Sequence, residues 1–200
     1  MNLAIAATVF GLVAVAELPD KTMIANIVMG SRGRPFAVWI GSTSAFAIHA
    51  AVAVVAGRFL QLLPHRVLET VIAVAFGLGA LYLLFVPEKT ERRKGEEEAT
   101  REGAVLPETA SWRVSVGAFG VILLGEIGDL TQLLIVNLEA RYKSPVSVFT
   151  GGFLALAAVG AFAAFSGRAL LRVLPLSVIR RIGGVALLGF CAYSIYGLVR

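Results

Sequence analysis

Apolar residues fall along the chain in six long blocks separated by shorter polar stretches. The blocks cover roughly residues 3–29, 35–62, 67–87, 113–138, 145–171 and 178–199. Each block is close to the roughly 20 residues that a helix needs to cross a bilayer. Runs such as AAVAVVAG do not alternate between apolar and polar positions, so helices are favoured over strands. We therefore predict an all-α integral membrane protein with six transmembrane helices.

The composition agrees with this prediction, because 58% of the 200 residues are hydrophobic and only 16% are charged. This is too apolar for a soluble domain of the same size. The first block could instead be a signal peptide that ends at Ala14-Val15-Ala16. A spanning helix is favoured, because no Lys or Arg precedes the apolar run and hydrophobicity resumes after Thr22.

Basic residues set the expected orientation. Lys and Arg are more numerous in the loops that follow the first, third and fifth blocks than in the other loops. By the positive-inside rule these loops face the cytoplasm and both termini face outward. The net charge of +5 is explained by this topology, and no basic face with interleaved aromatic residues indicates a nucleic-acid partner.

One hydrophilic stretch divides the chain. Residues 88–112 carry mixed charge and few bulky apolar side chains, which predicts a flexible cytoplasmic linker. The motif ELPDKT at 17–22 on one side of it matches EIGDLT at 126–131 on the other. With three helices in each half, the second half enters the membrane in the opposite orientation. We predict two inverted three-helix repeats, residues 1–87 and 113–200, with a site near the midplane between them.

The two motifs place four carboxylates near the expected bilayer centre. Glu17 and Asp20 are three residues apart, as are Glu126 and Asp129, so each pair would project from one face of a helix. Each buried charge there costs at least about 2.5 kcal/mol. Lys21 can neutralise one acid, and a divalent cation or protons would have to compensate the others.

The backbone is expected to depart from a regular helix at the same points. Pro19 lacks an N–H and Gly128 weakens the equivalent position of the fourth block. Thr22, Thr131 and Gln132 add neutral oxygens nearby. A site of carboxylates, carbonyls and hydroxyls suits Ca²⁺, Mn²⁺ or Mg²⁺ rather than copper or zinc.

Purely structural roles for these polar residues are also open. Glu17 could pair with Lys21 within one helix while Asp20 caps a helix start, although this leaves Glu126 and Asp129 unexplained. His49 could relay protons or simply bind a neighbouring carbonyl.

The paired E-x-G-D-[K/R]-[S/T] motifs, in the first and fourth of six helices and split by a charged loop, resemble those of the transmembrane protein 165 family. This family is also called uncharacterised protein family 0016. The resemblance implies a manganese and/or calcium exporter that exchanges the cation for protons, and we expect a bacterial plasma membrane as its location. This sequence departs from the family pattern at two positions. The family motif has glycine where this chain has Pro19, and a basic residue where this chain has Leu130.

The residue roles that the resemblance implies follow from the matched positions. Proton coupling would involve Glu17 and Glu126, and Lys21 and Gln132 would support the site. The cation would be bound by residues of both motifs, namely Glu17, Asp20, Thr22, Glu126, Asp129 and Thr131.

Two other functions are compatible with the pattern. One is an exporter of a small organic solute such as an amino acid, and the other is a membrane scaffold in which the acids only hold helices together. An enzyme is not expected, because no Ser-His-Asp set, phosphate loop or HExxH motif is present. We expect no permanently bound cofactor, and we expect divalent metal ions and the lipid bilayer as partners.

Overall fold

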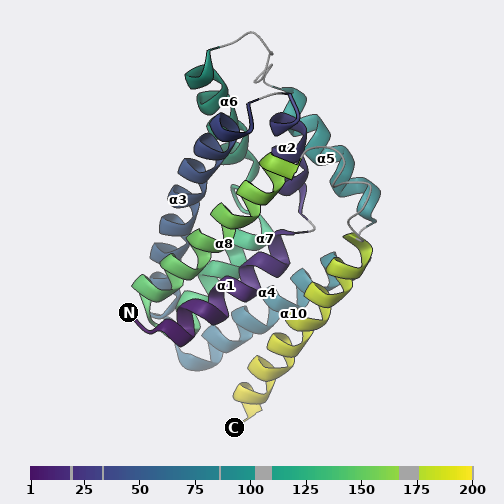
Figure 1. Cartoon of the computed structure of the whole chain (residues 1–200). Helices are drawn as coiled ribbons and strands as arrows, with labels where there is room; N and C mark the ends of the chain where they lie inside the picture. The colour runs from purple at the N-terminus through teal and green to yellow at the C-terminus, as the bar shows by residue number, and fades with distance from the viewer. Residues whose placement is uncertain (19, 33, 86, 102–109, 167–175, 200) are drawn as a thin grey trace.

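The computed structural model describes residues 1–18, 20–32, 34–85, 87–101, 110–166 and 176–199, and every regular element within these ranges is a helix (Figure 1). The helices are α1 (Leu3–Glu17), α2 (Lys21–Gly30), α3 (Pro35–Leu60), α4 (His65–Phe85), α5 (Glu88–Arg101), α6 (Ser111–Gly125), α7 (Leu130–Tyr142), α8 (Pro145–Ser166) and α10 (Leu176–Val199). The all-α prediction is therefore confirmed for the described part of the chain.

The first and fourth apolar blocks are each broken into two helices. Helices α1 and α2 meet at an angle of 73°, and α6 and α7 meet at 68°. Both breaks fall inside the motifs, at residues 18–20 and 126–129. Pro19, to which one break was attributed, lies outside the described residues. At the other break Gly128 has a φ of +75°, a left-handed conformation that glycine adopts without the steric penalty of a Cβ.

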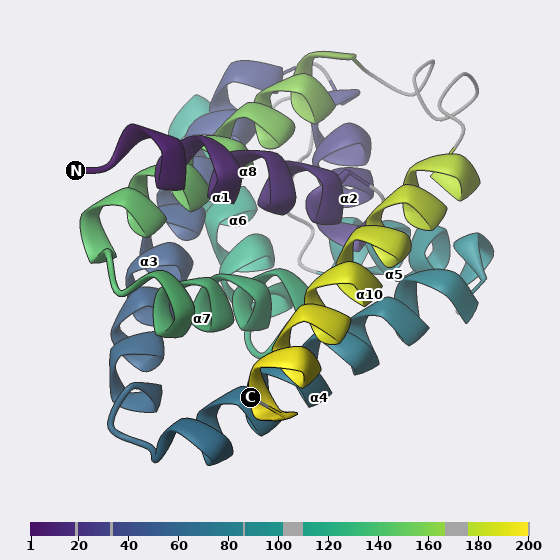
Figure 2. The same ribbon diagram turned by 90° about the horizontal axis from the view of Figure 1, so that it is seen from below.

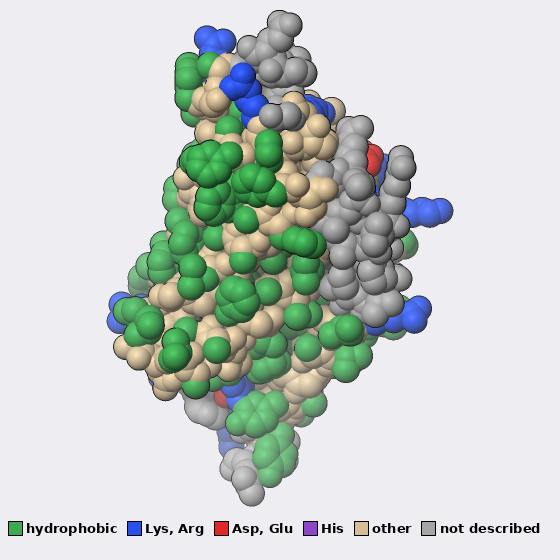
Figure 3. Space-filling model, in the orientation of Figure 1, with side chains coloured by type: hydrophobic (Ala, Val, Ile, Leu, Met, Phe, Trp, Pro, Cys, Tyr) green, Lys and Arg blue, Asp and Glu red, His purple; other side chains and the backbone are tan. Residues whose placement is uncertain are grey.

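Three described helices, α3, α4 and α8, have segments long and apolar enough to cross a membrane, and the number rises to five if each broken pair forms one span. The sixth block corresponds to α10, which contains the apolar segment Arg181–Tyr196. Hydrophobic side chains are spread over the face shown in Figure 3, and basic side chains lie around its edges. This distribution is typical of a membrane-embedded surface.

The core consists of a bundle in which α1 packs on α8 and α6 packs on α3, with α2 and α7 between them. Small residues allow both close approaches. A Cβ at Gly41 would meet the backbone of Ser115 on α6, and a Cβ at Gly151 would meet the backbone of Ala6 on α1. The indole N–H of Trp39 also donates to the carbonyl of Ala157 at 3.0 Å, joining α3 to α8.

Helices α4 and α10 form a separate pair along one side of this bundle (Figures 1 and 2). Phe76 and Phe190 pack with their ring centroids 5.4 Å apart, and Gly184 lies close to Leu84. The pair touches the bundle mainly at α1 and α7. It therefore leaves a seam along α7, which the cavity described below occupies.

The hydrophilic stretch differs from expectation, because residues 88–101 form a helix rather than a flexible linker. Helix α5 packs along α2, with Ala99 fully buried. Gly95 lies so close to the backbone carbonyl of Lys21 and to Ile24 that a Cβ would overlap with both. Docking against α2 stabilises a helix whose composition alone favours a solvated chain.

Candidate metal centre

The two breaks position the four acids of the motifs. Glu17 is the last residue of α1, and Asp20 is the N-cap of α2. In the other half Glu126 is the C-cap of α6, and Asp129 is the N-cap of α7. The prediction that each pair projects from one face of a helix is therefore wrong, whereas the predicted departure from a regular helix at these points is confirmed. Each glutamate ends one helix and each aspartate begins the next, so the acids line the break itself.

Three of the acids converge. One carboxylate oxygen from each of Glu17, Asp20 and Glu126 lies within 4.8 Å of the other two. Their exposed fractions are only 1%, 8% and 2%. Like charges this close and this well buried repel one another strongly unless a cation or protons compensate them. The cluster contains residues from both motifs, as the sequence predicted.

The two threonines of the motifs hold Glu17 from both sides. Thr22 donates its hydroxyl hydrogen to Glu17 Oε1 at 2.7 Å and also lies 3.1 Å from Asp20 Oδ2. Thr131, from the other half, donates to Glu17 Oε2 at 3.0 Å. Both oxygens of Glu17 are therefore oriented by hydroxyl groups, while Glu126 Oε1 is buried with no hydrogen-bond partner.

Asp129 lies beside this cluster and pairs with Lys21. The Lys21 ammonium is 3.6 Å from Asp129 Oδ2 and donates to the carbonyl of Gly125 at 2.5 Å. The acid that Lys21 neutralises is therefore one of the second motif, to which the lysine of the first motif crosses. The alternative of a Glu17–Lys21 pair within one helix is not what the geometry gives.

A hydrogen-bonded chain connects the second break to α3. The carbonyl of Leu123 can only accept, so His49 Nε2, at 3.0 Å, carries the hydrogen. His49 Nδ1 lies 3.4 Å from Gln132 Nε2, and Gln132 Oε1 accepts from the N–H of Gly128 at 2.8 Å. Gln132 thus supports the break rather than pointing into the acid cluster. His49 could have been a proton relay or a residue bound to a neighbouring carbonyl. Its contact with Leu123 corresponds to the second role.

The first break is supported differently. Asn26 donates to the carbonyl of Thr22 at 3.1 Å and accepts from Ser42 of α3 at 2.5 Å. Sequence reasoning did not identify Ser42, since a single serine in an apolar helix carries no distinguishing signal. The network fixes the turn of α2 that carries Thr22.

The donor set of the cluster is entirely oxygen. Carboxylates and hydroxyls suit hard divalent cations such as Ca²⁺ and Mn²⁺, whereas zinc and copper favour imidazole and thiolate ligands. The cluster contains no His or Cys. These residues therefore fit an oxygen-ligated divalent cation.

Apolar helices of membrane-spanning length, with acids buried among them at helix breaks, define an integral membrane protein with a polar interior. Such intramembrane acids mark ion or proton pathways in this class. The chain belongs to the family described as divalent cation/proton antiporter GDT1, whose family model matches residues 5–91 and 114–199. The family resemblance drawn from the paired motifs is thus confirmed. The family is one of cation transporters and not of enzymes.

Curated relatives agree with this assignment. The chain is 28% identical to a Vibrio cholerae protein named "Putative manganese exporter", over 85% of this chain and 80% of that protein. It is 27% identical to Protein PAM71, chloroplastic, from Arabidopsis thaliana, over 96% of this chain. The chain spans only 57% of the length of that protein and 58% of its Arabidopsis homologue. No solved structure significantly matches the chain.

Proposed function

We propose that this protein exports a divalent cation, Mn²⁺ and/or Ca²⁺, from the cytoplasm in exchange for protons. The observation that carries the proposal is the buried cluster of Glu17, Asp20 and Glu126, whose oxygens lie within 4.8 Å of one another. The family description and the name of the Vibrio cholerae relative support the choice of cargo.

In this proposal the three clustered acids bind the cation directly, together with Thr22 and Thr131. The acids bind a metal only when deprotonated, so protons and cation compete for the same oxygens. Glu17 and Glu126 are the proton-coupling groups, since they belong to different halves and share the cluster. Asp129 lies at its edge, where Lys21 balances its charge.

The transport cycle would use two inverted three-helix repeats, residues 1–87 and 113–200, joined by the 88–112 segment. The two halves pack in a related way, which supports the two inverted repeats. Gly41 on α3 lies close to α6, and in the same way Gly151 on α8 lies close to α1. The similar bends of 73° and 68° also support it. Rocking of one half against the other would expose the cluster to each side in turn.

The proposed orientation places α5 in the cytoplasm and both termini outside. Both termini lie in the lower part of Figure 1 and α5 lies in the upper part, which agrees with an even number of crossings. The proposed location is a bacterial plasma membrane, which the bacterial origin of the Vibrio cholerae relative supports, whereas the Arabidopsis relatives are named chloroplastic.

The test is cation uptake into proteoliposomes that contain a pH-sensitive dye, with Mn²⁺, Ca²⁺ and Mg²⁺ compared. We expect cation-driven proton movement in the wild type and its loss in Glu126→Gln. The matched control is Glu139→Gln, since Glu139 is fully buried on α7 but lies outside the cluster. This control should retain transport.

Two results would overturn the proposal. Equal loss of transport in Glu126→Gln and Glu139→Gln would show that any buried acid matters, as expected for a membrane scaffold. No flux with any of the three ions from a folded protein would instead favour the exporter of a small organic solute.

A further inference from the structure

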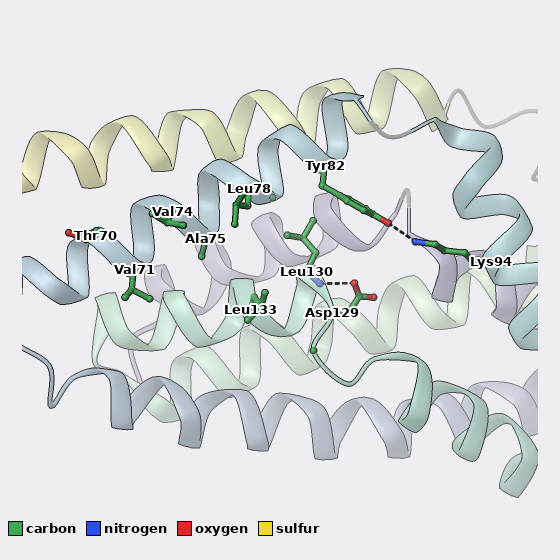
Figure 4. Close-up of a pocket in the computed structure, with 12 residues that line it drawn as sticks. Thr70, Val71, Val74, Ala75, Leu78, Tyr82, Lys94, Asp129, Leu130 and Leu133 are labelled. Atoms are coloured by element: carbon green, nitrogen blue, oxygen red, sulfur yellow. Dashed lines mark hydrogen bonds between the residues drawn. The ribbon is translucent and has the colours of Figure 1, made fainter.

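A cavity of about 660 Å³ lies in the seam between α4 and α7 (Figure 4). This volume is within the range of small-ligand sites. Most of its lining is apolar and comes from one face of α4 and the facing side of α7. The apolar side chains are Val71, Val74, Ala75, Leu78, Leu130 and Leu133.

The cavity is long, and its two ends differ in chemistry. Along α4 it runs from Thr70 to Tyr82, a rise of about 18 Å. Half of a bilayer's hydrocarbon core is about 15 Å thick, so the cavity is as long as the acyl region of one leaflet. The lining side chains Val71, Val74 and Leu78 are exposed, so the cavity is open along α4.

A positive charge lies at the end of the cavity near α5. Lys94 donates to the Tyr82 hydroxyl at 3.1 Å, and its ammonium lies 5.6 Å from the centre of the Tyr82 ring. Figure 4 shows this pair at one end of the cavity, beyond the apolar side chains of α4. An ammonium and a phenol at the end of an apolar groove match a phosphate headgroup followed by a hydrocarbon chain.

We propose that this cavity binds one anionic phospholipid from the leaflet in which α5 lies, with the headgroup at Lys94 and Tyr82 and one acyl chain along α4 and α7. The complementary charge, the apolar lining and the lateral opening together identify this occupant. The lipid site does not depend on the transport function proposed above. Its chain would lie against the Gly128–Leu130 segment, next to Asp129.

Other occupants fit less well. A hydrated divalent cation would meet the positive charge of Lys94 at one end and an apolar wall along most of the cavity. The one carboxylate in the lining, Asp129, already pairs with Lys21. A zwitterionic lipid offers the same chain but carries its own positive charge toward Lys94. The net negative headgroup is therefore the distinguishing feature.

The experiment is native mass spectrometry of the full-length protein in detergent with added phosphatidylglycerol or phosphatidylcholine of identical acyl chains. We expect the wild type to prefer phosphatidylglycerol and Lys94→Gln to bind it about fivefold more weakly, the effect of one lysine near an anionic lipid. The matched control is Lys89→Gln, because Lys89 is an exposed lysine of the same helix outside the cavity.

A second pair of variants tests the chain-binding part of the cavity. Ala75→Phe fills the cavity and should weaken both lipids, whereas Ala51→Phe, on the exposed surface of α3, should weaken neither. Retained binding in Ala75→Phe, or equal affinity for the two lipids in wild type and Lys94→Gln, would overturn the proposal. Displacement of the lipid by inorganic phosphate alone would also overturn it, since the site would then bind only an anion.

Discussion

Thr131 donates its hydroxyl hydrogen to Oε2 of Glu17 at 3.0 Å, although the two residues are 114 positions apart. Together with the Lys21–Asp129 pair, this bond joins the two motifs directly. The two broken helices therefore form one polar centre. A substitution in one motif removes a contact that a residue of the other motif makes.

Replacing Thr131 with Ala should raise the KM for the transported cation about tenfold, because a hydrogen bond to a charged group contributes about 1.5 kcal/mol or more. Thr131→Ser keeps the hydroxyl and should restore most of the affinity. Thr150→Ala is the control, since the Thr150 hydroxyl bonds only its own helix at the carbonyl of Val146. A similar KM in all three variants would mean that Thr131 does not position Glu17.

Gly128→Ala should lower stability by about 1 to 2 kcal/mol, the penalty for a Cβ in a left-handed conformation. No heavy atom lies within 4 Å of a Cβ built at this position, so the backbone conformation alone is responsible. The matched control is Gly11→Ala, because Gly11 lies in a helix and a Cβ built there also has free space around it. Thermal unfolding in detergent should show a lower midpoint for Gly128→Ala and an unchanged or higher one for Gly11→Ala.

Lys21→Met should destabilise the protein by roughly 2 kcal/mol at neutral pH, because it leaves Asp129 without its ion-pair partner in a mostly buried position. Asp129→Asn introduced in addition removes the uncompensated charge and should recover part of the loss. Unfolding of the wild type, both single variants and the double variant forms a complete cycle. Strictly additive effects would show that the 3.6 Å contact contributes no coupling energy.

Mn²⁺ should raise the unfolding temperature of the wild type, since a ligand that binds only the folded state stabilises it by about 2.7 kcal/mol at 100 times its Kd. The stabilisation should shrink as the pH falls, because protons compete for the clustered carboxylates. Glu126→Gln should weaken the Mn²⁺ effect at every pH, while Glu139→Gln should leave it unchanged. A shift that does not depend on pH would argue against a carboxylate site.

The positions of the helix breaks were predictable from the sequence. Gly128 interrupts an apolar run next to charged residues, and the motif repeats on the other side of the charged stretch. These signals predicted one centre with all four acids of the motifs, of which Glu17, Asp20 and Glu126 cluster while Asp129 lies beside them and pairs with Lys21. An N-cap position was considered for Asp20 but not for Asp129, because the three-residue spacing of Glu126 and Asp129 is equally compatible with a continuous helix.

The partner of Lys21 was not predictable. In the sequence the lysine lies next to Asp20 and four positions after Glu17, so a pair within the first motif was the alternative considered. Its actual contacts, Asp129 and Gly125, depend on how α2 packs against the break between α6 and α7. Contacts of this kind depend on tertiary packing, and the spacing of residues within one segment does not reveal how helices pack.

Helix α5 was missed for the same reason. Residues 88–101 have a strongly hydrophilic composition, and short helices of this length are marginal in water. The buried positions of Gly95 and Ala99 against α2 supply the missing stabilisation. Neither small residue indicates burial when only the sequence is considered.

Gly95 packs closely against the carbonyl of Lys21 and the side chain of Ile24. This contact fixes the length of the connection between the two halves. Its anchoring point is the first turn of α2, one residue after Asp20. Residues inserted before Gly95 would lengthen the connection between α4 and this contact. The stretch between α4 and Gly95 should therefore tolerate little change in length.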